Sequence, residues 1–246
     1  MRRKMLYHPD LNFLNTGELG LLEDACQAVE SFVRKSAMIN GCSHKTRDAH
    51  VTTYASLHGS FSVYDSFEEY SVFPSEVMDC TIRISNAHMK FVSQRLTIPA
   101  YGFSVKISDA GSTVLNLPMV NFPLFPINNV SRFLKIFKAI NYFYSGNSFQ
   151  KLWQAGKIFN NTALVLPGFF HPSFINQLRK LIMRWRRFIL AFDYHSIGSY
   201  RLGDPIVKYR LVPLDAPSKS NETRIDRAIE DYVNDRKYEL ELQVQY

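Results

Sequence analysis

The sequence predicts an α+β domain in which a run of short antiparallel strands precedes a run of helices. Residues 17–35 and 130–192 carry apolar side chains at intervals of three and four, which is typical of amphipathic helices. Residues 50–125 instead alternate short β-branched and aromatic runs with turn residues, and residues 238–246 alternate again at the end. Because strands and helices occupy separate stretches, the pattern favours an α+β domain over a doubly wound sheet.

The first expected element is the helix over residues 17–35, which ends at a polar stretch covering residues 40–48. Four strands follow, and the turn Asp109-Ala110-Gly111 joins the last two of them as a hairpin. These strands are predicted over residues 60–65, 79–85, 101–108 and 112–117.

Helical spacing then returns over residues 130–144, 148–159 and 172–192, with Pro172 in the first turn of the third helix, where proline is tolerated. Residues 205–213 predict a fifth strand. The charged segment 218–237 is compatible with a solvated helix or a flexible linker, and residues 238–246 predict a sixth strand. Six such strands are compatible with an open sheet or with part of a barrel.

The chain has 246 residues, 46% of them hydrophobic, and a formal net charge of +7. This apolar content supports a sizeable core and excludes disordered and collagen-like classes. No run of about 18 apolar residues predicts a transmembrane helix, and no apolar run follows the basic start, so we expect a cytoplasmic location. The positive charge permits nucleic-acid binding, but the basic residues are scattered and no recognition motif accompanies them, so nucleic acid ranks low among the partners.

Three cysteines, Cys26, Cys42 and Cys80, have neither a CxxC spacing nor the spacing of a zinc site. We therefore expect reduced, mostly buried thiols that behave as small hydrophobic side chains. The sequence also lacks the motifs typical of nucleotide-binding loops, zinc proteases and nucleophile elbows.

Residues 47–63 form a further candidate strand, which has His50 near its start. On a strand, His50 would share a face with Thr52 and Tyr54, because side chains alternate. From this pattern alone we interpret His50 as a structural or surface histidine, since a position on a strand supplies no chemistry.

Three further segments follow the step Arg47-Asp48-Ala49-His50, in the order Arg83-Ile84-Ser85-Asn86, Asn121-Phe122-Pro123-Leu124-Phe125 and Tyr194-His195-Ser196, the last ahead of Arg201-Leu202-Gly203. Together they resemble the haem-binding core of the catalase-related family, over roughly residues 47 to 245. The resemblance implies an antiparallel β-barrel of the catalase type with flanking helices, six of its eight strands being present. It divides the chain into an N-terminal helical arm, residues 1–46, and a haem-binding barrel, residues 47–246, with inserted helices at 130–192.

The resemblance also implies haem b as the cofactor and assigns residue roles by position. It makes His50 the distal acid and base for a bound peroxide, Ser85 the group that orients His50, and Tyr194 the axial ligand of the iron. This chain departs from the family at two positions. Val120 stands where the family has a distal Asn, and Leu190 stands where the family has an Arg that keeps the axial tyrosine ionised. Asn121 is expected as a second distal polar group, since a one-residue bulge would exchange it with Val120. The remaining expected contacts with the haem are made by Arg47, Arg83, Phe125 and Phe133.

The implied function is a haem-dependent enzyme acting on hydrogen peroxide or an organic hydroperoxide, such as that of a fatty acid. A peroxidase, isomerase or dehydratase is expected rather than a true catalase, because the distal amide and the ligand-side Arg are altered. The alternative is a haem-free fold that serves as a binding or scaffold subunit. In either case the two missing barrel strands leave open edges, which a second copy or a partner chain would pair.

The predicted helix over residues 172–192 carries five basic residues among apolar ones. Such a helix is compatible with a peripheral contact to an anionic membrane surface. We favour a core helix whose charged face lies in water, because surface helices usually have such a face.

Overall fold

The structure is a computed structural model that describes residues 4–64, 67, 72–92, 99–124, 127, 129–163, 170–184 and 187–246. It contains eight strands, β1 (Thr53–Ser62), β2 (Val77–Asn86), β3 (Tyr101–Asp109), β4 (Ser112–Val120), β5 (Tyr194–Ser196), β6 (Tyr200–Arg201), β7 (Ile206–Pro213) and β8 (Leu240–Gln245). The helices are α1 (Thr16–Asn40), α2 (Val130–Ser145), α3 (Ser148–Ala163), α5 (Pro172–Met183) and α6 (Ile225–Asp235), with short 3-10 helices η1 (Pro9–Asn12) and η4 (Ile189–Ala191).

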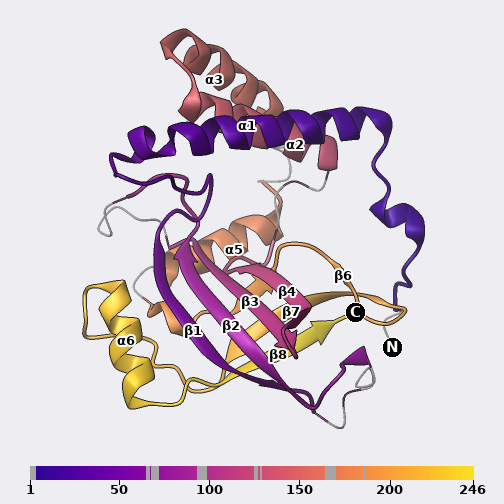
Figure 1. Ribbon diagram of the computed structural model, residues 1–246, viewed down its shortest axis with the longest axis vertical. Coiled ribbons are helices and arrows are strands. Elements are labelled where there is room, and N and C mark those ends of the chain that lie inside the picture. The colour runs from indigo at the N-terminus through magenta and orange to yellow at the C-terminus, as the bar shows by residue number, and fades with distance from the viewer. Residues whose placement is uncertain are drawn as a thin grey trace.

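All eight strands belong to one antiparallel sheet (Figure 1). Strands β1 to β4 form a meander, β5 then pairs β4 with β7, β6 pairs the first part of β7, and β8 pairs the other side of β7. The predicted α+β class with an antiparallel sheet and flanking helices is confirmed. Closure into a barrel is not, because no pairing joins β1 to β8 within the described part of the chain.

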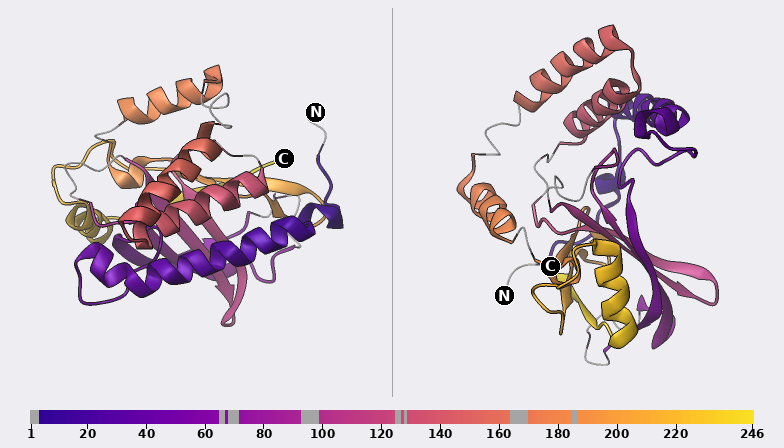
Figure 2. Two further views of the ribbon diagram at one scale, coloured as in Figure 1. Left: turned by 90° about the horizontal axis from the view of Figure 1, so that it is seen from above. Right: turned by 90° about the vertical axis from the view of Figure 1, so that its left-hand side faces the viewer.

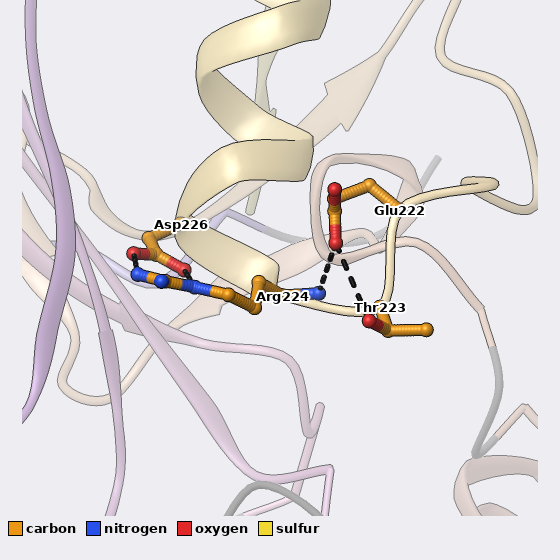
Figure 3. Close-up of polar contacts among 4 residues, drawn as sticks. All are labelled: Glu222, Thr223, Arg224 and Asp226. Atoms are coloured by element: carbon orange, nitrogen blue, oxygen red, sulfur yellow. Dashed lines mark hydrogen bonds and ion pairs between the residues drawn. The ribbon is translucent and has the colours of Figure 1, made fainter.

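Helix α6 packs against β1 at the place where barrel closure would pair that strand (Figure 2). The segment that was expected to be a solvated helix or a linker is thus a helix, and it begins after an exposed polar turn (Figure 3). There the Glu222 carboxylate accepts hydrogen bonds from the Arg224 backbone N–H at 2.8 Å and from the Thr223 hydroxyl at 3.3 Å, while the Arg224 guanidinium pairs with Asp226. The bond from the Arg224 backbone lowers the pKa of Glu222, and the bond from the Arg224 side chain lowers the pKa of Asp226.

The core lies on one face of the sheet, and strand β3 shows why. Tyr101, Phe103, Val105 and Ile107 alternate with more polar residues and are all buried, whereas Lys106 between them is exposed. We call the face that carries Phe103 the inner face and the face that carries Lys106 the outer face. Apolar residues of β2, β4, β7 and η4 complete the cluster on the inner face.

Helices α1, α2 and α3 form a separate layer beyond one end of the sheet (Figure 1). Helix α1 begins with a capping box, in which Asn15 and Glu18 satisfy each other's backbone N–H groups, and ends at Gly41 with a left-handed φ of 61°. Helix α2 packs on α1, and Lys138 and Asp24 join the two helices through an ion pair of 2.7 Å.

The expected helix over residues 172–192 is wrong in its second half. Helix α5 ends at Met183, and the chain continues into the buried 3-10 helix η4. Phe188 and Phe192 flank η4 and are also buried, so this segment is almost wholly apolar. The Phe188 N–H donates to the Ser218 carbonyl at 3.0 Å instead of to a helical carbonyl. Packing into the core therefore overrides the helical spacing of the sequence.

Candidate functional site

His50 does not lie on a strand, as the sequence pattern suggested, but in the turn before β1. Its backbone has a left-handed φ of 54°, which is uncommon for a residue other than glycine. The ring Nδ1 lies 3.2 Å from the Ser85 Oγ, and the His50 carbonyl accepts a hydrogen bond of 2.7 Å from the Arg83 guanidinium. The structure therefore brings together three of the residues that the sequence singled out, namely His50, Ser85 and Arg83.

Gly102 on β3 provides the space for the His50 ring. A Cβ atom at Gly102 would lie 2.3 Å from the His50 Nδ1, 2.5 Å from its Cε1 and 2.9 Å from the Ser85 Oγ. These distances are far below van der Waals contact, so the ring fits over β3 only because position 102 has no side chain.

The electrostatic surroundings favour a neutral His50. Burial lowers the pKa of His50, and the positive charges of Arg83 and Arg47 lower it further, against a raising contribution from the backbone of Asn86. Arg47 itself is exposed. Arg83 is held within the sheet by a second hydrogen bond, from its Nε to the Thr53 hydroxyl at 3.0 Å.

The side chain of Asn121 is hydrogen-bonded to the backbone through both its oxygen and its nitrogen. Its Oδ1 accepts the Tyr101 N–H at 2.9 Å, and its Nδ2 donates to the Pro99 carbonyl at 2.7 Å, both buried. These two bonds use one donor and one acceptor of the amide to hold the start of β3.

Phe133 stacks on Phe137 of the same helix, with ring centroids 5.6 Å apart. The other expected aromatic contact, Phe125, lies outside the described residues.

Tyr194 lies in the centre of the core. Its side chain is fully buried, its ring contacts Phe103 with centroids 4.6 Å apart, and its hydroxyl donates to the Ile189 carbonyl at 2.9 Å. Burial raises the pKa of Tyr194 well above its ordinary value, and the neighbouring Tyr238 and Tyr101 raise it further. The phenol is therefore held protonated and hydrogen-bonded inside the core.

The pairing register places His50 and Tyr194 on opposite faces of the sheet. One row of paired residues crosses the outer face in the order Thr53, Ser85, Gly102, Val120, His195, Arg210, Gln243. We call this the outer row. His50 packs on it at Gly102, whereas Tyr194 precedes His195 and so points to the inner face, toward Phe103. This arrangement does not fit haem held between the His50 imidazole and the Tyr194 phenol.

The outer row continues into a cavity of about 540 Å³ between α5 and strands β5, β7 and β8. From the sheet, His195, Lys208, Arg210 and Gln243 line it, and from α5 the residues Gln177, Lys180, Leu181 and Arg184 line it. The cavity is large enough for a small organic ligand. We call it the α5 cavity.

Positive charge predominates in the α5 cavity. Arg210 pairs with Asp193, the carboxylate of the cavity lining, at 2.6 Å and lies 3.5 Å from the Gln243 Oε1. Within the described part of the chain, no carboxylate pairs with Lys180, Arg184 or Lys208. The lining therefore presents three cations beyond the one that Asp193 neutralises.

His195 is the titratable group closest to neutral pH in this lining. Burial lowers its pKa, and Arg210 and Lys208 lower it further, against the raising effect of Asp193. A neutral imidazole can donate or accept a hydrogen bond and gains a proton if a bound anion raises its pKa.

The sequence carried a signal for the α5 cavity that motif reading did not use. Lys208 and Arg210 alternate with buried Val207 and Tyr209 in β7, and Gln243 and Gln245 alternate with apolar residues in β8. Period-two alternation predicts that these polar side chains share one face, but which helix covers that face depends on the tertiary structure.

No group of three or more His, Cys, Asp or Glu residues within the described ranges is placed to hold a metal ion. The three cysteines are free thiols, and burial raises the pKa of Cys80. The expectation that the cysteines are mostly buried is wrong, because Cys26 is exposed and Cys42 is half-buried, and Cys80 alone of the three is buried.

No protein-family model matches the sequence, and a search of curated proteins finds no similar chain. Among solved structures, the chain is similar to catalase A from Saccharomyces cerevisiae at 15% sequence identity and a TM-score of 0.46, over 75% of this chain and 38% of that one. It is similar to a fungal catalase at 14% identity and a TM-score of 0.46, over 76% of this chain and 37% of that one. The chain thus spans less than two fifths of the length of either catalase. The resemblance noted in the sequence is matched by a distant structural likeness only, which does not assign the chain to a family.

Proposed function

We propose that the chain is a haem-independent binding protein whose α5 cavity takes a small anionic ligand, such as a carboxylate or a phosphate ester. The observation that carries this proposal is the charge of the lining, where Lys180, Arg184 and Lys208 surround a cavity whose carboxylate is already paired with Arg210. Opposite charge in a partly enclosed site concentrates anions and strengthens their binding.

The polar groups of the lining support the same ligand class. Gln177, Gln243 and Gln245 offer amide N–H donors, and Arg184 offers a guanidinium that fits an oxyanion in two-point contact. His195, neutral in the empty cavity, would take up a proton as an anion binds, because the negative charge favours the imidazolium.

The haem-dependent conversion of a hydroperoxide stays a prediction from the sequence. The expected axial ligand, Tyr194, donates its hydroxyl to the Ile189 carbonyl on the inner face, and the expected distal residue, His50, lies on the outer face. This geometry favours the haem-free alternative, so we derive no step through haem.

Two measurements test the proposal. First, the protein incubated with haem should give no Soret band beyond that of free haem, and a Soret band that shifts on replacing Tyr194 with Phe would overturn it. Second, inorganic pyrophosphate should raise the melting temperature of the protein, since a ligand that binds only the folded state stabilises it.

Variants locate the second effect. Lys208→Gln and Arg184→Gln should each reduce the pyrophosphate-dependent shift, because each removes a cation of the α5 cavity. Lys106→Gln is the matched control, since Lys106 is exposed on β3 and does not line the cavity. An equal loss in the control, or no shift in the parent protein with any multivalent anion, would refute the assignment.

A further inference from the structure

Helix α5 is amphipathic in the reverse sense to an ordinary surface helix. Its polar residues Gln177, Lys180 and Arg184 face the α5 cavity beneath it. Leu181 faces the same way, but most large apolar residues of α5 lie on the opposite side beside Arg179 and are exposed, Ile175 by 48%, Leu178 by 41%, Ile182 by 52% and Met183 by 75%. A helix that covered a globular core would turn these residues inward.

Helix α3 shows the same reversal, and more strongly. Its exposed residues Phe149, Leu152, Trp153 and Phe159 lie on one side of the helix by their spacing, and each is at least 62% exposed. None of the residues of α3 is buried. The more sheltered positions, Gln154 and Ile158, lie on the other side of the helix, which by spacing is the side turned toward α2.

Figure 2 shows α5 on the side of the molecule opposite β1 and β2, and α3 in the helical layer beyond the end of the sheet, where it packs on the outside of α2. Large exposed apolar side chains on both α3 and α5 mark an interaction surface, because such surface is otherwise kept small in soluble chains. We call the exposed apolar side chains of α3 and α5 the apolar helix surface.

The charge around this surface narrows the choice of partner. From residue 110 to residue 192 the sequence contains ten Lys and Arg residues and no Asp or Glu. Lys151 and Lys157 lie on α3 itself, the latter with its Nζ 5.3 Å from the centre of the Trp153 ring, and Arg179 lies on the exposed side of α5. The two helices thus combine exposed apolar side chains with positive charge and carry no acidic residue.

We propose that the apolar helix surface binds an anionic lipid bilayer. Interfacial helices combine aromatic and aliphatic residues on one side with Lys and Arg beside them, so that the apolar side enters the acyl boundary while the cations meet acidic headgroups. A second copy of the chain is a poorer partner, because it would bring the same unbalanced positive charge to the interface.

The contact is peripheral. No helix among the described residues is both long enough and apolar enough to cross a bilayer. Helices α3 and α5 have 16 and 12 residues, which suits them to lying along a surface.

The test is sedimentation with vesicles, followed by the fluorescence of Trp153. The chain has two tryptophans, so a Trp185→Phe background leaves Trp153 as the only reporter. Vesicles of phosphatidylcholine alone are compared with vesicles of equal parts phosphatidylcholine and phosphatidylserine, in about 0.1 M and about 1 M salt, where the Debye length falls from ~10 Å to ~3 Å. We expect binding and a blue-shifted Trp153 emission with the anionic vesicles at the lower salt, and weak binding under the other conditions.

Variants separate the apolar and the electrostatic contributions. Phe149→Ser with Phe159→Ser should weaken binding by at least about tenfold, since excluding only ~60 Å² of apolar surface from the bilayer has that effect. Lys157→Gln and Arg179→Gln should each weaken it by about fivefold at the lower salt. The control is Phe13→Ser with Met38→Gln, which removes side chains that are 81% and 77% exposed outside α3 and α5.

Three results would overturn the proposal. These are no binding to phosphatidylserine vesicles, equal binding by the Phe149→Ser, Phe159→Ser variant, or a concentration-dependent dimer that this variant abolishes while the parent ignores vesicles. Lys208→Gln should bind vesicles normally, because Lys208 lies in the α5 cavity and not on α3 or on the exposed side of α5. The outcome is therefore independent of whether the cavity takes a small anion.

Discussion

Replacing Gly102 with alanine should displace the His50 ring. The added Cβ would lie 2.3 Å from the His50 Nδ1 and 2.9 Å from the Ser85 Oγ, so the imidazole must move and its contact with the Ser85 hydroxyl is lost. Overfilling a packed site of this kind costs about 1–3 kcal/mol of folding free energy.

Gly102→Ala should stabilise the protein, not destabilise it, when the His50 ring is absent. In a His50→Ala background the added methyl group has room once the Ser85 hydroxyl, 2.9 Å away, turns to another rotamer, and Gly102 has no positive φ that would exclude alanine. A Gly→Ala change at a compatible position stabilises by about 0.4–1 kcal/mol, because it restricts the unfolded chain. The coupling free energy between the two positions is therefore about 1.5–4 kcal/mol, well above the error of a double-mutant cycle.

Urea unfolding followed by circular dichroism measures the four corners of this cycle, with unchanged slopes as the condition for comparing midpoints. Gly59→Ala is a matched control, since Gly59 lies on β1 and nothing stands within 4 Å of its added Cβ. If Gly102→Ala has the same effect with and without the His50 ring, or no more effect than Gly59→Ala, then His50 does not pack on β3 as described.

Three further outcomes follow from groups described above. Asn121→Ala should lower the free energy of unfolding by about 1–3 kcal/mol for each of the two buried backbone groups that it leaves unpaired, measured by the same denaturation, and a neutral result would contradict its bracing of β3. Tyr194→Phe should cost ~1–3 kcal/mol because the Ile189 carbonyl loses its partner in the core; an unchanged midpoint would show that the carbonyl finds another donor. Because His50 and His195 have pKa values lowered by burial, acid favours the unfolded state: stability is fully present above pH ~6.5 and falls below it as the pH approaches the folded pKa values. The loss on lowering the pH should therefore shrink in a His50→Gln, His195→Gln double variant, and an equal loss would assign it to other groups.

The meander was predictable because its chemistry is local. Strands β2, β3 and β4 match the predicted residues 79–85, 101–108 and 112–117 closely, since one side of each strand faces the core and the alternation is visible in the sequence. The turn at Ala110 and Gly111, both with positive φ, was marked by its residues as well.

The end of α5 was not predictable in this way. Between residues 173 and 197 the sequence has neither Gly nor Pro, so no local signal interrupts the helical spacing. The helix stops because residues 188–192 enter the core under α6, a contact made with a segment that comes later in the chain. Strands β5 and β6 were missed for a similar reason, since three and two residues are too few to show a period.

The candidate site was half predictable. The contact between His50 and Ser85 that the resemblance implied is present, because both residues lie near paired ends of β1 and β2. The face to which Tyr194 points depends on its register with Leu211, which is set by the whole sheet and not by residues near Tyr194. A tyrosine ahead of Arg201-Leu202-Gly203 therefore carries no information about the side of the sheet from which it acts.

Residues 4–7, which we call the N-terminal segment, have a consequence for folding kinetics. Leu6 bridges to Pro205, the Ile206 N–H donates to the Met5 carbonyl at 2.8 Å, and the Lys4 Nζ lies 4.2 Å from the centre of the Tyr246 ring. These contacts join segments about 200 residues apart, so they raise the contact order and close only after the β6–β7 hairpin exists. Docking of the N-terminal segment should be a late step in refolding. In amide exchange, the backbone N–H groups of residues 4–7 should lose protection before those of any strand of the meander.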